Sequence, residues 1–214
     1  MHHRYSKLVL LITTILAGTQ SGYSAKAENG FEIGGQLGLI TAPQFETSNL
    51  ASDSPTDQGG GLFGLIVGYD FAISSHLSLG VESGYSYGYK ISEINIDGSH
   101  YSLNQWQTPM LATAKYYFNN GLIVSAKAGM SYIRQFVDTS SYYTPTDDDN
   151  WEILPQATFE IAYAFDNGVN VGGAFSYVFG NSHNIGSESA VSANQFDVAS
   201  TAALYATITY HLPI

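Results

Sequence analysis

Hydrophobic and polar residues alternate along most of this chain with a period of two. In segment 77–89, leucine, valine or tyrosine occupies every odd position except Ser83, whereas glycine, serine and glutamate occupy the even positions. Successive side chains of a β-strand point to opposite faces, so this period indicates strands, and a helical period of 3.6 does not fit it. The same test predicts eight strands, at 31–40, 61–71, 77–89, 105–118, 122–132, 151–165, 169–179 and 201–212.

The connections between these strands alternate in length. Short turns are expected at 72–76, 119–121 and 166–168. The links at 41–60, 90–104, 136–150 and 180–199 are long and polar. Antiparallel strands with short turns at one end and long loops at the other are typical of an up-and-down barrel in an outer membrane.

The two faces of the strands differ in bulk as well as in polarity. Glycine, serine and a few charged residues share one face, and leucine, valine and aromatic residues share the other. A soluble barrel would turn the bulky face inward, but eight strands enclose too little space for it. We therefore predict an all-β fold, an eight-stranded antiparallel up-and-down transmembrane β-barrel whose bulky face contacts lipid.

Aromatic residues of the bulky face gather at two heights, as in the girdles at the two membrane boundaries of such barrels. A β-sandwich, the alternative for a strand-rich chain, does not predict two heights. The predicted periplasmic girdle is Tyr69, Phe71, Tyr116, Phe118, Tyr163, Phe165 and Tyr210. The predicted outer girdle is Tyr85, Tyr87, Trp106, Tyr132, Trp151, Tyr177 and Phe179.

The amino terminus has the features of an export signal. His2, His3, Arg4 and Lys7 precede an apolar run at 8–17, and 25–27 reads Ala-Lys-Ala, which suits cleavage. We expect residues 1–27 to be removed and 28–214 to form a single barrel domain. Because no segment offers the ~20 consecutive apolar residues of a spanning helix, strands would cross the membrane.

Charge and cysteine content narrow the functional classes. Once residues 1–27 are removed, four basic residues face 18 acidic ones, which argues against nucleic-acid binding. The chain has no cysteine, so it is not a small disulfide scaffold.

The chain resembles the small eight-stranded outer-membrane barrels of the opacity-protein and outer-membrane-protein-A transmembrane type. The resemblance lies in Gly68-Tyr69-Asp70-Phe71, in segments 79–85 and 114–118, and in the last strand. It implies a bacterial outer-membrane protein of Gram-negative type, with adhesion, host-factor binding or envelope integrity as its task.

Members of that family usually end in an aromatic residue that the barrel-assembly machinery reads, with apolar residues at every second position upstream. Here the last anchor is a leucine, and Pro213 and Ile214 follow it. The implied assembly signal is Leu204, Ala206, Ile208, Tyr210 and Leu212.

Charged residues on the inner face are expected to pair across the lumen. Glu82, Lys115, Lys127 and Glu160 lie inward at similar depths, and an unpaired buried charge would cost several kcal/mol. We predict an ion-pair ladder that closes the barrel, and a gated or conducting role is the alternative.

Catalytic and metal sites are weakly indicated. His76 and Ser78, Ser99 and His100, or Ser182 and His183 with Glu188 could serve a lipid hydrolase, but such pairs arise readily in serine-rich loops. Asp147 to Asp149 could bind a divalent cation, although a solvated acidic run is the simpler interpretation. We therefore assign no catalytic, cofactor or metal residue.

The leading hypothesis is a monomeric, non-enzymatic outer-membrane protein with a structural or surface-interaction role. Its partners would be outer-membrane lipid and lipopolysaccharide, the assembly machinery during biogenesis, and a host or surface ligand on four long acidic outer loops. The alternatives are a narrow channel for small or apolar solutes and, third, a lipid-modifying enzyme.

Overall fold

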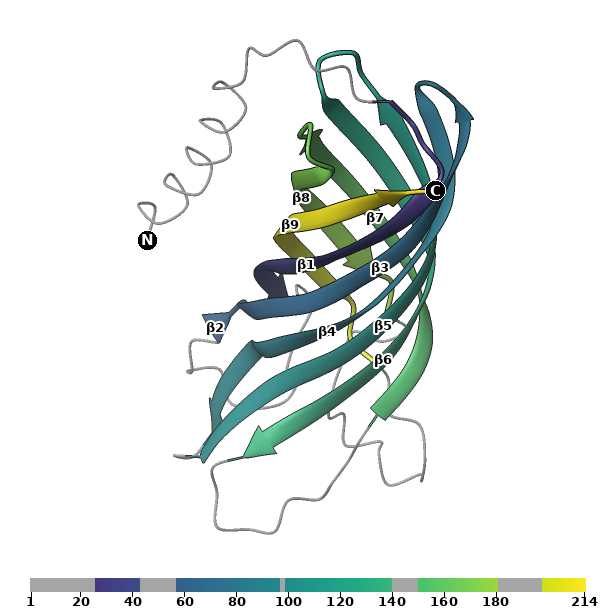
Figure 1. Cartoon of the computed structure of the whole chain (residues 1–214). Helices are drawn as coiled ribbons and strands as arrows, with labels where there is room; N and C mark the ends of the chain where they lie inside the picture. Colours follow the sequence, from purple (N-terminus) through teal and green to yellow (C-terminus); the bar gives the residue numbers. More distant parts are fainter. Residues whose placement is uncertain (1–25, 43–56, 97–98, 140–149, 181–197) are drawn as a thin grey trace.

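In the residues that it describes, the computed structural model contains eight long antiparallel strands and one short strand (Figure 1). It describes residues 26–42, 57–96, 99–139, 150–180 and 198–214. The strands are β1 (Gly30–Thr41), β2 (Asp57–Gln58), β3 (Gly60–Ser74), β4 (Leu77–Ile96), β5 (Ser99–Tyr117), β6 (Leu122–Thr139), β7 (Asn150–Ala164), β8 (Val169–Val178) and β9 (Thr201–Pro213).

The sheet closes on itself. Each long strand pairs with its neighbour in the chain, β1 pairs with both β3 and β9, and the short β2 adds to the edge of β4. Each of the eight long strands therefore has a paired neighbour on both sides, which is what a sheet surrounded by lipid requires. The predicted fold class, an eight-stranded antiparallel up-and-down barrel, is confirmed.

One predicted connection is wrong. The segment 90–104 was expected to be a long loop, but β4 continues to Ile96 and β5 already begins at Ser99. The pairing register shifts between Gly88 and Ser92, and Lys90 has a left-handed backbone with φ of 54°. An irregularity of this kind breaks the alternation of faces, so the outer part of the hairpin no longer has a period of two.

Two of the short turns have the same construction. In each, an asparagine side chain accepts a hydrogen bond from the backbone N–H two residues later: Asn120 from Leu122 (3.2 Å) and Asn167 from Val169 (3.1 Å). A glycine follows the asparagine with positive φ, 84° at Gly121 and 81° at Gly168. This is a three-residue hairpin loop whose last position favours glycine.

Large apolar side chains cover the outside of the barrel. Leu37, Leu65 and Met110 are each 70% exposed, and the other exposed leucine, valine and phenylalanine side chains of the strands share that outward face. An apolar belt of this size is stable only against lipid. No helix in the part of the chain that the structure describes is long and apolar enough to cross a membrane.

We predict that Gly121→Ala lowers the free energy of unfolding by about 1–2 kcal/mol, because an L-residue is strained at this φ. Its new Cβ would also lie 2.9 Å from the Tyr163 ring. Urea unfolding of the refolded protein in lipid vesicles measures the change. Gly61→Ala is the control, since nothing lies within 4 Å of a Cβ there. Equal stability of the two variants would contradict this reading of the turn.

Candidate functional site in the barrel lumen

The periplasmic end of the lumen is packed with apolar side chains. Ala27, Tyr117, Ile123, Ala162 and Ala164 form one buried cluster there. These residues lie next to the short turns, so the cluster covers the base of the barrel. Because apolar contacts exclude water, this layer bounds the charged interior at the end that carries the short turns.

The first ion-pair group lies above this layer. Lys115 of β5 contacts the carboxylates of Glu32 on β1 and Asp70 on β3, the latter at 2.9 Å. The Thr209 hydroxyl of β9 donates a hydrogen bond of 2.5 Å to Glu32. All three charged side chains are buried. The lysine therefore links β5 to β1 and β3 across the lumen, and the Thr209 hydrogen bond adds β9 to the group.

A second group repeats this arrangement with other strands. The Lys127 ammonium of β6 contacts Glu82 Oε2 of β4 at 2.6 Å and Glu160 Oε2 of β7 at 2.7 Å. The Thr207 hydroxyl of β9 donates a 2.6 Å hydrogen bond to the other oxygen of Glu160. Each lysine is thus held by two carboxylates, and one carboxylate of each pair accepts a threonine hydroxyl.

The four residues of the predicted ladder fall into these two groups. Glu82, Lys127 and Glu160 are in contact, whereas Lys115 belongs to the other group. Its partners Glu32 and Asp70 were not among the predicted site residues. Both lie at inward positions of their strands, so the alternation of faces was a signal that could have found them.

A chain of glutamine side chains crosses the lumen on the outer side of the ion pairs. The Gln135 amide donates to Gln105, Gln105 to Gln107, and Gln107 to Gln156, with N–O distances of 2.8, 3.1 and 2.8 Å. Gln156 then donates to the Ser176 hydroxyl at 2.9 Å. Each amide serves as donor and acceptor, which satisfies polar groups that would otherwise be buried at a cost.

The outer end of the lumen is again apolar and is held by the same chain. Gln135 exchanges two hydrogen bonds with the backbone of Ala199, one as donor to its carbonyl (3.2 Å) and one as acceptor from its N–H (3.1 Å). This fixes the segment before β9 inside the barrel. The buried side chains around it are Ile133, Leu154, Val178 and Val198, and a second cluster contains Ile40, Leu62, Ile91 and Leu103.

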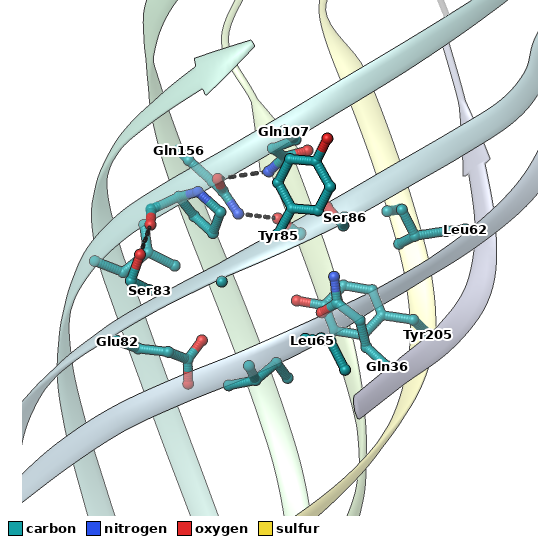
Figure 2. A pocket seen from close by; sticks show the side chains of 16 residues that line it. Gln36, Leu62, Leu65, Glu82, Ser83, Tyr85, Ser86, Gln107, Gln156 and Tyr205 are labelled. Atoms are coloured by element: carbon teal, nitrogen blue, oxygen red, sulfur yellow. Dashed lines mark hydrogen bonds between the residues drawn. The ribbon is translucent and has the colours of Figure 1, made fainter. Parts of the chain in front are cut away.

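A small cavity remains beside the glutamine chain. The side chains of Gln36, Ser86, Gln107 and Gln156 line its inner side, and Tyr85 lies on the wall (Figure 2). Water centres can occupy about 20 Å³ of it, which is room for about one molecule.

The predicted girdle residues lie on the outward face. On the periplasmic side, rings pack edge to face at Tyr69 and Phe71, Tyr116 and Phe118, and Tyr163 and Phe165. On the outer side, Trp106 packs against Tyr85 and Tyr87, Trp151 against Tyr132, and Tyr177 against Phe179. Tyr210 and the other residues of the implied assembly signal also face outward on β9.

Of the residues considered for catalysis, the structure describes the side chains of His76 and Ser78, and these two do not come together. His76 bonds through its two ring nitrogens to Ser75 (2.9 Å) and Asn119 (3.0 Å) at the short turns, whereas Ser78 points into the lumen. Within the described residues, no group of three acidic or histidine residues could hold a metal ion. The remaining candidates, Ser99, His100, Asp147 to Asp149, Ser182, His183 and Glu188, lie outside the residues whose side chains the structure describes.

Comparison with known proteins places this architecture in context. The family model of the outer membrane protein beta-barrel domain matches residues 8–199. Neisserial surface protein A has a similar structure, with a TM-score of 0.53, 13% sequence identity, and coverage of 86% of this chain and 97% of that one. No curated protein sequence matches this chain.

Two further solved structures are similar. OprG from Pseudomonas aeruginosa has a TM-score of 0.52 and 10% identity, and the match covers 89% of this chain and 99% of that one. Ail, the attachment invasion locus protein of Yersinia pestis, has a TM-score of 0.50 and 8% identity, and the match covers 87% and 99%. At these identities the similarity is one of fold.

We predict that Lys127→Met destabilises the barrel by about 3–5 kcal/mol, because Glu82 and Glu160 would then be buried without their cation. Urea unfolding in lipid vesicles measures the loss. Adding Glu82→Gln and Glu160→Gln to the same variant removes the uncompensated charges, so this triple variant should recover most of the stability. A single variant as stable as the wild type would contradict the assignment.

Proposed function

Because this chain belongs to the outer membrane protein beta-barrel domain family, we propose that it is a non-enzymatic outer-membrane protein with a sealed lumen that acts through its outer surface. The resemblance drawn from the sequence is confirmed by the family match and the similar solved structures. Its place is the bacterial outer membrane, and outer-membrane lipid surrounds it. The sealed lumen, the surface role and the monomeric state are our proposals.

The filling of the lumen is the observation that carries this proposal. Apolar side chains at both ends, two ion-pair groups and the glutamine chain succeed one another along the barrel. An ion would have to separate buried charges or break several hydrogen bonds to pass. Those interactions are strong in a low-dielectric interior, so conduction is disfavoured.

If the lumen is sealed, the outer surface of the barrel is the part that can bind a partner. The outer connections include 43–56, 140–149 and 181–197, which lie outside the described residues and carry five aspartates and two glutamates. Loops on a rigid scaffold commonly carry binding functions. We propose that these acidic outer segments contact a host or surface ligand, and that the aromatic girdles hold the barrel at lipid and lipopolysaccharide.

Biogenesis completes the proposal. Residues 1–27 would direct export and be cleaved. The barrel-assembly machinery would then read the outward residues of β9, namely Leu204, Ala206, Ile208, Tyr210 and Leu212. Pairing of β9 with β1, from Gly30 to Thr41, closes the barrel, and we propose that recognition of β9 prepares this pairing.

The purified, refolded protein should show no steady single-channel conductance in planar lipid bilayers. Heat-dependent gel migration serves as the folding control, since a folded barrel migrates differently from an unfolded chain. A folded and silent protein agrees with the sealed lumen. Reproducible openings would contradict it and favour the narrow channel for small or apolar solutes.

Protein isolated from outer membranes should begin at Glu28. Cleavage there removes Ala27, whose N–H donates to the Ser75 carbonyl at 3.0 Å and whose side chain is buried in the periplasmic cluster. Losing one backbone hydrogen bond at the chain end is a small cost, about 1 kcal/mol. Intact mass measurement identifies the first residue. A mature chain that still contains Ala27 would contradict the proposed cleavage site.

A further inference from the structure

The wall of the barrel has an interruption between β4 and β5. The pairing of β4 with β5 stops after Ser83 and Met110 and resumes, in the same register, at Ser86 and Gln107. Gly84 therefore lies opposite Pro109 but is not paired with it. Proline has no N–H to donate. The pairing of β5 with β6 continues without a break through Pro109. The hydrogen bond that proline cannot donate is therefore missing on the other side, toward β4. The Ser83 hydroxyl, which donates to the Pro109 carbonyl at 2.8 Å, bridges part of this gap.

Glycines make the wall thin at the same level. Gly84 on β4 and Gly64 on β3 take inward positions, and Gly35 on β1 takes an outward position. A row is a set of residues paired side by side across the strands. The three glycines lie in successive rows, since Gly84 pairs with Ile66, Gly35 with Leu65, and Gly64 with Gln36. The glycines add no side chain of their own to the wall at these three points, and the Ser86 side chain lies against the inner side of Gly64.

A groove lies on the lipid-facing side of this thin wall. It lies between two neighbouring rows of outward-facing side chains. It crosses the strands in the order β5, β4, β3, β1, β9 and β8. Five strand spacings give it a length of about 24 Å, enough for a long hydrocarbon chain. Its lining is almost wholly apolar: Gly35, Leu37, Phe63, Leu65, Tyr85, Tyr87, Trp106, Val171, Ala206 and Ile208, with Gln36, Gly64 and Thr207 at its floor.

The groove and the lumen cavity share part of their lining. Gln36, Leu65 and Tyr85 border both spaces. The outer space is apolar, whereas Gln107 and Gln156 give the inner space amide groups, and Figure 2 shows these side chains around the one cavity with Tyr85. The cavity, about the size of one water molecule, thus has amide groups among apolar side chains such as Leu62 and Ile66. An apolar groove beside it is complementary to an amphiphile with a long tail and a small polar head.

We propose that this part of the wall binds a single-chain amphiphile with an uncharged hydroxyl head, such as a long-chain alcohol. Its tail lies in the groove, and its hydroxyl reaches the cavity at the boundary of Gln36, Leu65 and Tyr85 that the two spaces share. The Glu82 carboxylate also borders the cavity, which disfavours the carboxylate of a fatty acid. This site is separate from the outer loops and does not require a conducting lumen.

Tryptophan fluorescence can test the site, because the chain has only two tryptophans. Trp106 lines the groove and Trp151 does not. Both lie on the outer side and pack on a tyrosine, with ring centroids 5.0 Å apart for Trp106 with Tyr85 and 5.8 Å apart for Trp151 with Tyr132. Trp151→Phe therefore reports on the groove alone, and Trp106→Phe is its matched control.

The probe is a long-chain alcohol brominated along its chain, titrated into each variant in phosphatidylcholine vesicles. We expect saturable quenching of Trp106 and only linear, collisional quenching of Trp151. Linear quenching of both would overturn the proposal. So would shielding of Trp106 from every probe, the result expected if a second copy of the chain covered the groove.

Filling the groove should abolish saturation. Gly35→Leu places a side chain on its floor, and the nearest atom to the new Cβ is the Gly64 oxygen at an ordinary 3.5 Å, so folding is preserved. We expect the apparent affinity to fall by about tenfold or more, or 1.4 kcal/mol. Gly61→Leu is the control, since it faces open space outside the groove lining and should leave saturation unchanged. Saturation that survives Gly35→Leu would overturn the groove assignment.

Two further probes test the choice of occupant. A fatty acid with the same brominated chain should bind about tenfold more weakly than the alcohol, because its carboxylate would approach Glu82. Brominated phosphatidylcholine should quench both tryptophans without saturation. Equal saturation by the acid would overturn the head-group assignment, and saturation by the phospholipid would assign the groove to ordinary bilayer lipid.

Discussion

Closure of the backbone hydrogen-bond ladder is the constraint on which the rest of this structure depends. In lipid, no water satisfies an exposed N–H or carbonyl group, so the first and last strands must pair. Here β1 and β9 pair over twelve residues, from Gly30 with Pro213 to Thr41 with Ala202. Closure fixes which side of each strand faces lipid and which faces the lumen, and the two-residue period of the sequence follows from that.

Closing only eight strands leaves a narrow interior, and its contents follow from that narrowness. Inward positions carry glycine, serine and threonine where strands approach across the lumen, and the few charged side chains must be satisfied by one another. The two lysines each contact two carboxylates from different strands. The ion pairs therefore act as links between strands, and the stability of the wall and the closure of the lumen depend on the same side chains.

The sequence predicted the strands well because alternation is a local property that closure enforces at every position. It failed at 90–104, where the irregularity around Lys90 brings Ile91 and Ser92 to buried positions in succession. Pairing across the lumen was harder to predict. Which carboxylate meets Lys115 depends on the tilt and register of strands far apart in the chain, and the glutamine chain depends in addition on side-chain rotamers. Alternation constrains neither of these.

The interruption at Pro109 is one of two in the pairing of β4 with β5, and the other is the register shift between Gly88 and Ser92. A proline facing β4 removes a hydrogen bond that lipid cannot replace, and three glycines at the same level give up packing that larger residues would supply. Natural proteins tend to accept such local losses where a site requires them. At this level the apolar outer groove and the polar lumen cavity share Gln36, Leu65 and Tyr85 as their boundary. Ligand binding at this level therefore explains two features together: the weakened wall, and the position of an apolar groove next to the lumen cavity.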